Sequence, residues 1–186
     1  MIKPHYQRTV VPNAERRKLL SSVRLKMLNP FFFKQLTPAT PYHSFHRVRI
    51  FEFGSHKLAI KDTEYSKRHG MNWKAIRKDV TNFMVAIRQK QILPKKYILK
   101  LPKAYGRVGK FLVMEYVKDL TEELIAQDKR MIDLIDNAKK ELKTHLTKFS
   151  LSENTKTWLV AQVDQAMVAG IKNGKVILYL PYDTQL

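Results

Sequence analysis

The spacing of hydrophobic residues predicts two amphipathic helices in the first half of the chain. Over residues 72–89 one apolar stripe recurs at helical spacing: Trp73, Ile76, Val80, Phe83, Met84 and Ile87. Over residues 13–28 a narrower stripe follows an Asn that can cap a helix: Leu20, Val23 and Met27. The helix over 13–28 is basic on its remaining faces, and Asn29-Pro30 ends it.

Three further segments have patterns typical of strands. Residues 46–61 alternate on both sides of Gly54-Ser55, which predicts a β-hairpin. Tyr97–Leu101 lies between two prolines and reads as a short strand. After a turn at 107–109, residues 110–117 form an apolar run typical of a buried strand.

The second half of the chain begins with helices and ends with a hairpin. A short helix is expected over residues 121–126 and a longer one over residues 131–146, because apolar residues there recur at helical spacing. Residues 155–169 fit a third helix less clearly. Asn173-Gly174 between two alternating runs predicts a β-hairpin, since these residues tolerate the positive φ angles of a type I′ turn.

These elements predict an α+β protein. A chain of 186 residues has the common size of one domain. We expect one compact molecule with two lobes, in three segments: a basic helix with a Pro- and Phe-rich extension (1–41), a β-rich α+β part (42–118), and a part with helices and a hairpin (119–186). The aromatic run Phe31–Phe33 in the first segment is expected to pack on the domain, and would mark a docking site if exposed.

Positive charge is concentrated in the first 110 residues. They contain 25 Lys and Arg against 5 Asp and Glu, whereas residues 111–186 contain 10 against 11, which gives the net charge of +19. Such a field attracts a polyanion: nucleic acid, an anionic membrane face or an acidic protein surface. Solubility alone is the simpler explanation of the charge. The basic part ends close to the boundary predicted at residue 118.

Composition also limits the class of protein. The chain has no cysteine, so disulfides and thiolate zinc sites are excluded, and a cytoplasmic, intracellular location is expected. Its apolar runs are far shorter than the roughly 20 residues of a transmembrane helix. The six histidines show no spacing typical of a metal site.

Two short motifs resemble the N-lobe of protein kinases. Leu58-Ala59-Ile60-Lys61 resembles the Val-Ala-Ile-Lys strand of that family, and Phe111–Val117 resembles the strand that leads into the kinase hinge. The helix over 72–89 and the strand Tyr97–Leu101 lie between them, as the family requires. The resemblance implies that 97–117 forms adjacent strands of one sheet.

The resemblance also implies roles for individual residues. Lys61 would bind the phosphates of ATP, and Asp79, the acid on the helix over 72–89, would pair with it beneath the hairpin in place of the family's Glu. Backbone groups from Glu115 to Val117 would receive the adenine ring.

The catalytic motifs of the family are incomplete. Asp164 is the best match to the catalytic base, but Ala169 stands where a metal-binding Asn is expected. Asp183 could serve as the metal-binding Asp only in a shifted register, and Pro41–Arg49 has no Gly for a phosphate loop. The resemblance therefore implies a pseudokinase-like binding or regulatory protein with residual ATP binding, no metal and little phosphoryl transfer. An active form would be an ATP-dependent phosphotransferase.

The alternative is a basic nucleic-acid-binding protein of an unrelated α+β fold. Lys and Arg cluster in four segments, 16–26, 47–61, 67–78 and 88–110, and aromatic residues are interleaved with them. Phosphate contact with base stacking uses this composition. The helix over 13–28 could instead dock an acidic protein or an anionic membrane.

Overall fold

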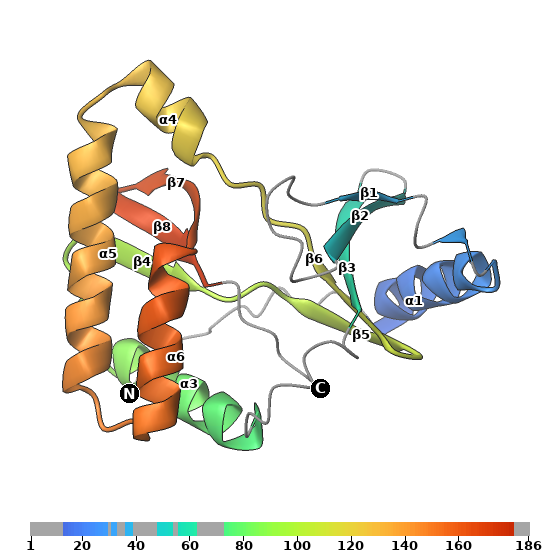
Figure 1. The fold of residues 1–186 in the computed structure, drawn as a ribbon, viewed down its shortest axis with the longest axis horizontal. Helices are drawn as coiled ribbons and strands as arrows, with labels where there is room; N and C mark the ends of the chain where they lie inside the picture. Colours follow the sequence, from blue (N-terminus) through green and yellow to red (C-terminus); the bar gives the residue numbers. More distant parts are fainter. Residues whose placement is uncertain are drawn as a thin grey trace. The chain divides into compact units, whose positions relative to one another are not determined.

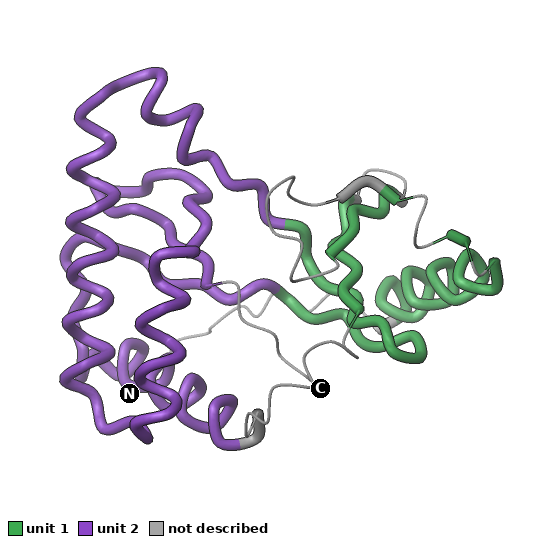
Figure 2. Tube along the Cα trace, in the orientation of Figure 1, with its two compact units in different colours: residues 1–68, 103–116, 186 green, residues 69–102, 117–185 purple. Residues whose placement is uncertain are grey.

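The computed structural model describes residues 13–29, 31–32, 36–38, 48–53, 56–62 and 73–180. The chain divides into two compact units (Figure 2). Unit 1 comprises residues 1–68, 103–116 and 186, and unit 2 comprises residues 69–102 and 117–185. Figure 1 shows the helices and strands of each unit.

Unit 1 contains an antiparallel five-stranded sheet and the helix α1 (Asn13–Met27). In their order across the sheet, the strands are β1 (Thr37–Pro38), β2 (Val48–Phe53), β3 (His56–Asp62), β6 (Phe111–Glu115) and β5 (Ala104–Val108). The pairing of β2 with β3 confirms the hairpin predicted over residues 46–61.

One face of this sheet is covered by α1, which lies against β5 (Figure 1). Leu19 and Val23 of the helix are buried in one cluster with apolar side chains of the strands: Phe51, Leu58, Ile60, Val108 and Val113. A glycine lets the helix approach closely, since a Cβ built on Gly106 would lie only 2.9 Å from Leu20 Cδ1. Gly106 also has φ +149°, a conformation that other residues rarely adopt.

Unit 2 contains a three-stranded sheet and four helices of the described part of the chain. The sheet has the order β4 (Tyr97–Lys100), β8 (Lys175–Tyr179), β7 (Met167–Lys172), with β4 and β8 parallel. The helices are α3 (Trp73–Arg88), α4 (Thr121–Gln127), α5 (Met131–Lys148) and α6 (Glu153–Asp164).

The apolar stripes of three helices meet the sheet in the core of unit 2. Ile76, Val80 and Phe83 of α3 join buried residues of α5 and α6 and of strands β4 and β8, among them Leu142, Leu159, Tyr97, Val176 and Leu178. Helices α5 and α6 run side by side (Figure 1). From Ile76 to Ile87, the stripe predicted over 72–89 thus packs in this core.

The α+β fold class is confirmed, as are the helices near 13–28, 72–89, 121–126 and 131–146. The closing hairpin is confirmed as well. Asn173 has φ 52° and Gly174 has φ 72°, as a type I′ turn requires. Residues 155–169, which fit a third helix less clearly, contain most of α6 and the start of β7.

One strand prediction is wrong. The strand at 97–100 is not in one sheet with residues 111–115, because Tyr97 and Leu99 are buried in the core of unit 2 and pair with β8. The strand beside β6 is instead β5, which the sequence analysis missed.

The two units also alternate along the sequence instead of forming consecutive segments. Helix α3 and strand β4, expected within 42–118, belong to unit 2. As a result, the end of the basic part near residue 110 does not follow the division between the units. Within the described residues, no helix is both long and apolar enough to cross a membrane.

Candidate functional site

The strand β3 presents its side chains alternately to the two faces of the unit 1 sheet. Leu58 and Ile60 lie on the face that α1 covers. Ala59 and Lys61, at the odd positions, therefore lie on the opposite face. Ala59 belongs to a separate buried cluster with Leu112 and Met114. We call this opposite face the Lys61 face.

On this face, the side chains of paired residues on neighbouring strands form rows across the sheet. Lys61 is opposite Val48 of β2 and Leu112 of β6, and Leu112 is opposite Arg107 of β5. One row across four strands thus reads Val48, Lys61, Leu112, Arg107. Two cations flank a buried leucine in this row.

The neighbouring row is apolar. Ala59 is opposite Ile50 on one side and Met114 on the other, and Met114 is opposite Ala104. Val48, Ala104 and Tyr116 pack against the buried cluster of this face. The Lys61 face therefore places a row containing two cations beside an apolar row.

Both cations of the first row are partly or fully withdrawn from water. Lys61 has a relative exposure of 5%, which is unusual for lysine. The Nε atom of Arg107 is buried and has no hydrogen-bond partner among the residues that the structure describes. A buried guanidinium nitrogen without an acceptor is costly, so it favours an anionic or acceptor group in a ligand.

The proposed hinge residues lie where β6 ends. Glu115 is opposite Leu58 in the sheet, so its side chain is not on the Lys61 face. Its N–H donates to the carbonyl of Lys103 at 2.7 Å, and its carboxylate accepts from the N–H of Lys103 at 3.1 Å. Val117 is the first residue of the following stretch of unit 2 and is half-buried.

Asp79 has a structural role within unit 2. Its Oδ2 accepts hydrogen bonds from the N–H of Ser152 at 3.3 Å and from the Ser152 hydroxyl at 2.9 Å. Ser152 is the N-cap residue of α6, so Asp79 holds the start of that helix. Burial raises the pKa of Asp79, but hydrogen bonds from Thr155 and Ser152 outweigh this and hold the pKa below its ordinary value. Pairing of Asp79 with Lys61, which belongs to unit 1, stays a prediction.

Asp164 is the last residue of α6 and precedes the β7–β8 hairpin, as expected. Its carboxylate is bound by Lys143 of α5 at 2.6 and 2.8 Å, and its carbonyl accepts from Lys139 at 3.1 Å. Ala169 lies within strand β7 and has no side-chain atom that could bind a metal. Asp183 lies outside the described residues.

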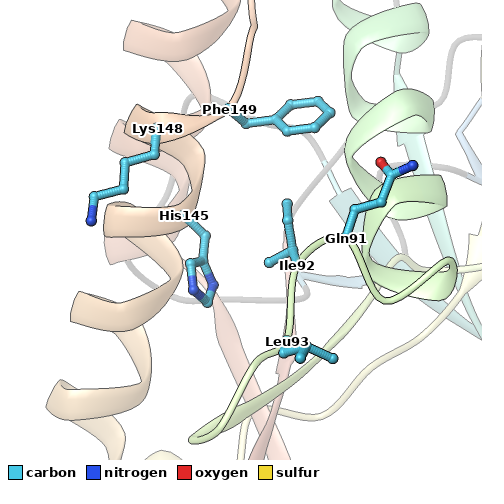
Figure 3. Close-up of a pocket in the computed structure, with 6 residues that line it drawn as sticks. All are labelled: Gln91, Ile92, Leu93, His145, Lys148 and Phe149. Atoms are coloured by element: carbon cyan, nitrogen blue, oxygen red, sulfur yellow. The ribbon is translucent and has the colours of Figure 1, made fainter.

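A shallow pocket of about 440 Å³ in unit 2 is a feature that the sequence did not indicate (Figure 3). Its lining comes from the end of α5 and the segment after α3: Gln91, Ile92, Leu93, His145, Lys148 and Phe149. The ring of Phe149 extends from α5 towards the segment that carries Gln91 and Ile92.

One polar residue of this pocket, His145, is hydrogen-bonded to a residue of the core. His145 Nδ1 lies 2.8 Å from the hydroxyl of Tyr97. Burial, and to a smaller extent the charge of Glu141, raises the pKa of Tyr97 well above its ordinary value. The pair is a partly buried hydrogen bond that orients the His145 ring, and no carboxylate lines the pocket beside it.

In the part of the chain that the structure describes, no three His, Asp or Glu side chains gather as a metal site would need. Comparison with known family models, with curated proteins and with solved structures gives no match. The Lys61 face is thus the best-supported candidate site, on the basis of its own geometry.

Proposed function

We propose that this chain is a kinase-like binding or regulatory protein that holds a nucleotide such as ATP on the Lys61 face and carries out little or no phosphoryl transfer. The observation that carries the proposal is the buried Lys61 in a row with Arg107, next to an apolar row. Because strand Tyr97–Lys100 lies in the other sheet, the proposal rests on these side chains more than on the order of strands.

The two rows match the two parts of a nucleotide. Phosphate groups are bound by Lys and Arg, and a partly desolvated cation binds them more strongly than an exposed one. The flat base of a nucleotide packs on apolar side chains such as those of Ala59 and Met114.

The proposed lack of transfer follows from the second half of the chain. Metal ions neutralise the charge that develops during phosphoryl transfer, and Ala169 supplies no ligand where the family uses Asn. The carboxylate of Asp164 lies 2.6 Å from the ammonium group of Lys143, so it is engaged in an ion pair within unit 2. An intracellular location, consistent with the absence of cysteine, is part of the proposal.

Thermal unfolding with and without ATP tests the proposal. ATP at about 100 times its Kd should stabilise the protein by about 2.7 kcal/mol, with or without magnesium. Lys61→Met should abolish this shift. Lys57→Met is the matched control, because Lys57 is on the same strand and the same face but is exposed and paired with Glu52 at 3.0 Å.

The proposal is wrong if ATP gives no shift at any concentration, or if Lys61→Met and Lys57→Met reduce the shift equally. A shift that requires magnesium would contradict the metal-independent form of the proposal.

A second candidate, nucleic-acid binding, is supported by the net charge of +19. Affinity for a random-sequence oligonucleotide should then fall steeply with salt, because each neutralised phosphate releases a counterion. An affinity that does not change with salt would exclude phosphate contacts of this kind.

A further inference from the structure

The outward side of α1 combines exposed hydrophobic residues with cations. Leu25, Leu28 and Phe31 have relative exposures of 69%, 76% and 62%. They follow one another at intervals of three residues, at the end of α1 and in the turn after it. Side chains three apart on a helix are neighbours, so Leu25 and Leu28 form one apolar patch with Phe31 beyond them.

Local hydrogen bonds fix this arrangement. Leu19 and Val23 of α1 point into the core, so the helix cannot turn Leu25 inward without losing them. Asn29 ends the helix and its side chain accepts a hydrogen bond from the N–H of Phe31 at 2.9 Å. The next residue, Phe32, packs edge-on against Phe51 with ring centroids 5.5 Å apart. Phe31 is thus exposed beside a half-buried neighbour that packs against the sheet.

Exposed cations lie on the helix that carries the apolar patch. Arg17, Lys18, Arg24 and Lys26 of α1 are all exposed, and the acid of the helix, Glu15, is half-buried near its first turn. We call the patch and these four cations the α1 outer face.

We propose that the α1 outer face docks on an anionic lipid membrane, lying in the plane of the interface. Anionic headgroups would meet the cations while Leu25, Leu28 and Phe31 enter the boundary of the acyl chains. Nucleic acid would satisfy the cations but leave the three apolar side chains in water. If a second copy of the chain docked through the same face, its cations would lie close to these cations and repel them.

This proposal is independent of nucleotide binding. Helix α1 packs on the face of the sheet opposite to Lys61. A protein that failed to bind ATP could still bind vesicles, and the two experiments fail separately.

The experiment is co-sedimentation of the full chain with vesicles of phosphatidylcholine alone and with vesicles that also contain about one third phosphatidylserine. We expect binding to the anionic vesicles that weakens with salt, and much less binding to the neutral ones. Arg17→Gln/Lys18→Gln/Arg24→Gln should weaken the binding about a hundredfold, at roughly fivefold for each cation. Leu25→Ser/Leu28→Ser/Phe31→Ser should weaken it at least roughly tenfold.

Matched controls lie in unit 2. Leu93→Ser removes a leucine that is 65% exposed, and Lys129→Gln/Lys140→Gln/Lys172→Gln removes three exposed cations. Both should bind anionic vesicles as the wild type does. Circular dichroism should show that every variant remains folded, because all the substituted side chains are exposed.

Three results would overturn the proposal. The first is no binding to anionic vesicles at low salt. The second is unchanged binding after Leu25→Ser/Leu28→Ser/Phe31→Ser, which would mean that charge alone attracts the protein. The third is a control variant that weakens binding as much as its α1 counterpart. If the α1 cations are needed for binding to a random oligonucleotide and not to vesicles, the surface is a nucleic-acid site instead.

Discussion

The two units use charged residues in different ways. In unit 2, carboxylates accept hydrogen bonds from backbone N–H groups that are distant in sequence or at a helix start. The Glu141 carboxylate accepts from the N–H groups of Lys95 and Lys96 at 3.0 and 2.7 Å. The Asp119 carboxylate accepts from the N–H groups of Thr121 and Val168, both at 3.1 Å. Unit 1 has 17 Lys and Arg against 5 Asp and Glu, a net charge of +12, while unit 2 has 18 against 11, a net charge of +7. Unit 1 therefore has fewer acids to offset its cations.

This contrast suggests a division of labour. The acids of unit 2 bind helix ends and turns, so they stabilise a core that is built from three helices and a small sheet. Two groups of unit 1 cations lie on opposite sides of one sheet, one on the Lys61 face and one on the α1 outer face. We infer that unit 1 carries the binding surfaces and that unit 2 supports the fold.

The largest expected effect tests whether the two cores are distinct. Leu142 of α5 has no exposed surface, and Leu142→Ala should cost about 2–5 kcal/mol because it removes buried methyl groups and leaves a cavity. Hydrogen exchange measured by segment should lose protection in α5, α6 and β8 more than in β2 and β3.

The reciprocal variant is Leu58→Ala in the core of unit 1, where the side chain is also fully buried. It should reverse the pattern of lost protection. If both variants reduce hydrogen-exchange protection equally throughout the chain, the two units unfold together. The two cores are then not separate units of stability.

A smaller effect is expected where α1 meets its sheet. Gly106→Ala should cost about 1–3 kcal/mol, because φ +149° is unfavourable for alanine and the new Cβ would crowd Leu20. Gly170→Ala in unit 2 is the control, since Gly170 has φ +130° but nothing within 4 Å of the new Cβ.

The loss of unfolding free energy in Gly106→Ala minus the loss in Gly170→Ala measures the cost of crowding Leu20 of α1. Gly106→Ala should be the more costly, and it should also lower the affinity for anionic vesicles if α1 is displaced. Equal losses would mean that only backbone strain matters and that the approach of Leu20 is easily relieved.

The fold class could be predicted because it depends on regular patterns. The α3 stripe and the Asn173-Gly174 turn are local signals that specify a helix and a hairpin directly. Strand β5 had no such signal. Its residues Ala-Tyr-Gly-Arg-Val alternate poorly, and Gly106 reads as a turn residue, although here it accommodates the neighbouring helix.

Sheet membership and site partners could not be predicted, because they depend on contacts distant in sequence. Tyr97–Lys100 pairs with a strand about 80 residues later, and its apolar residues would have suited either core. Arg107 was missed as a candidate because only the register β5–β6–β3 places it in a row with Lys61. The placement of Ala59 and Lys61 on one face follows from the alternation within β3 alone.

A pH-dependent effect on stability is expected from Asp79, which accepts hydrogen bonds from Ser152 at the start of α6. The pKa of Asp79 is lowered in the folded protein, so its contribution to stability is present above its unfolded pKa near 3.8 and is lost as the pH falls through the lower, folded pKa. Asp79→Asn should remove that contribution at neutral pH and flatten the pH dependence of unfolding in this acidic window.

Asp136→Asn, which changes an exposed acid on α5, is the control and should leave the acidic slope in place. If Asp79→Asn leaves stability at neutral pH unchanged but weakens ATP binding, the residue acts on the ligand, as the kinase resemblance implies, and its role as a cap is minor.

The smallest expected change in stability is for a variant of Asp164. This variant also tests whether unit 2 only supports the fold or takes part in catalysis. The Asp164–Lys143 pair is 65% and 35% exposed at its two side chains, so Asp164→Asn should cost no more than about 1 kcal/mol. Because the wild-type carboxylate is engaged in an ion pair with Lys143, we also expect no loss of any residual phosphotransferase activity, measured with radiolabelled ATP. A stability change within error combined with a large loss of such activity would show that unit 2 contributes a catalytic base, and the proposed division of labour would then be wrong.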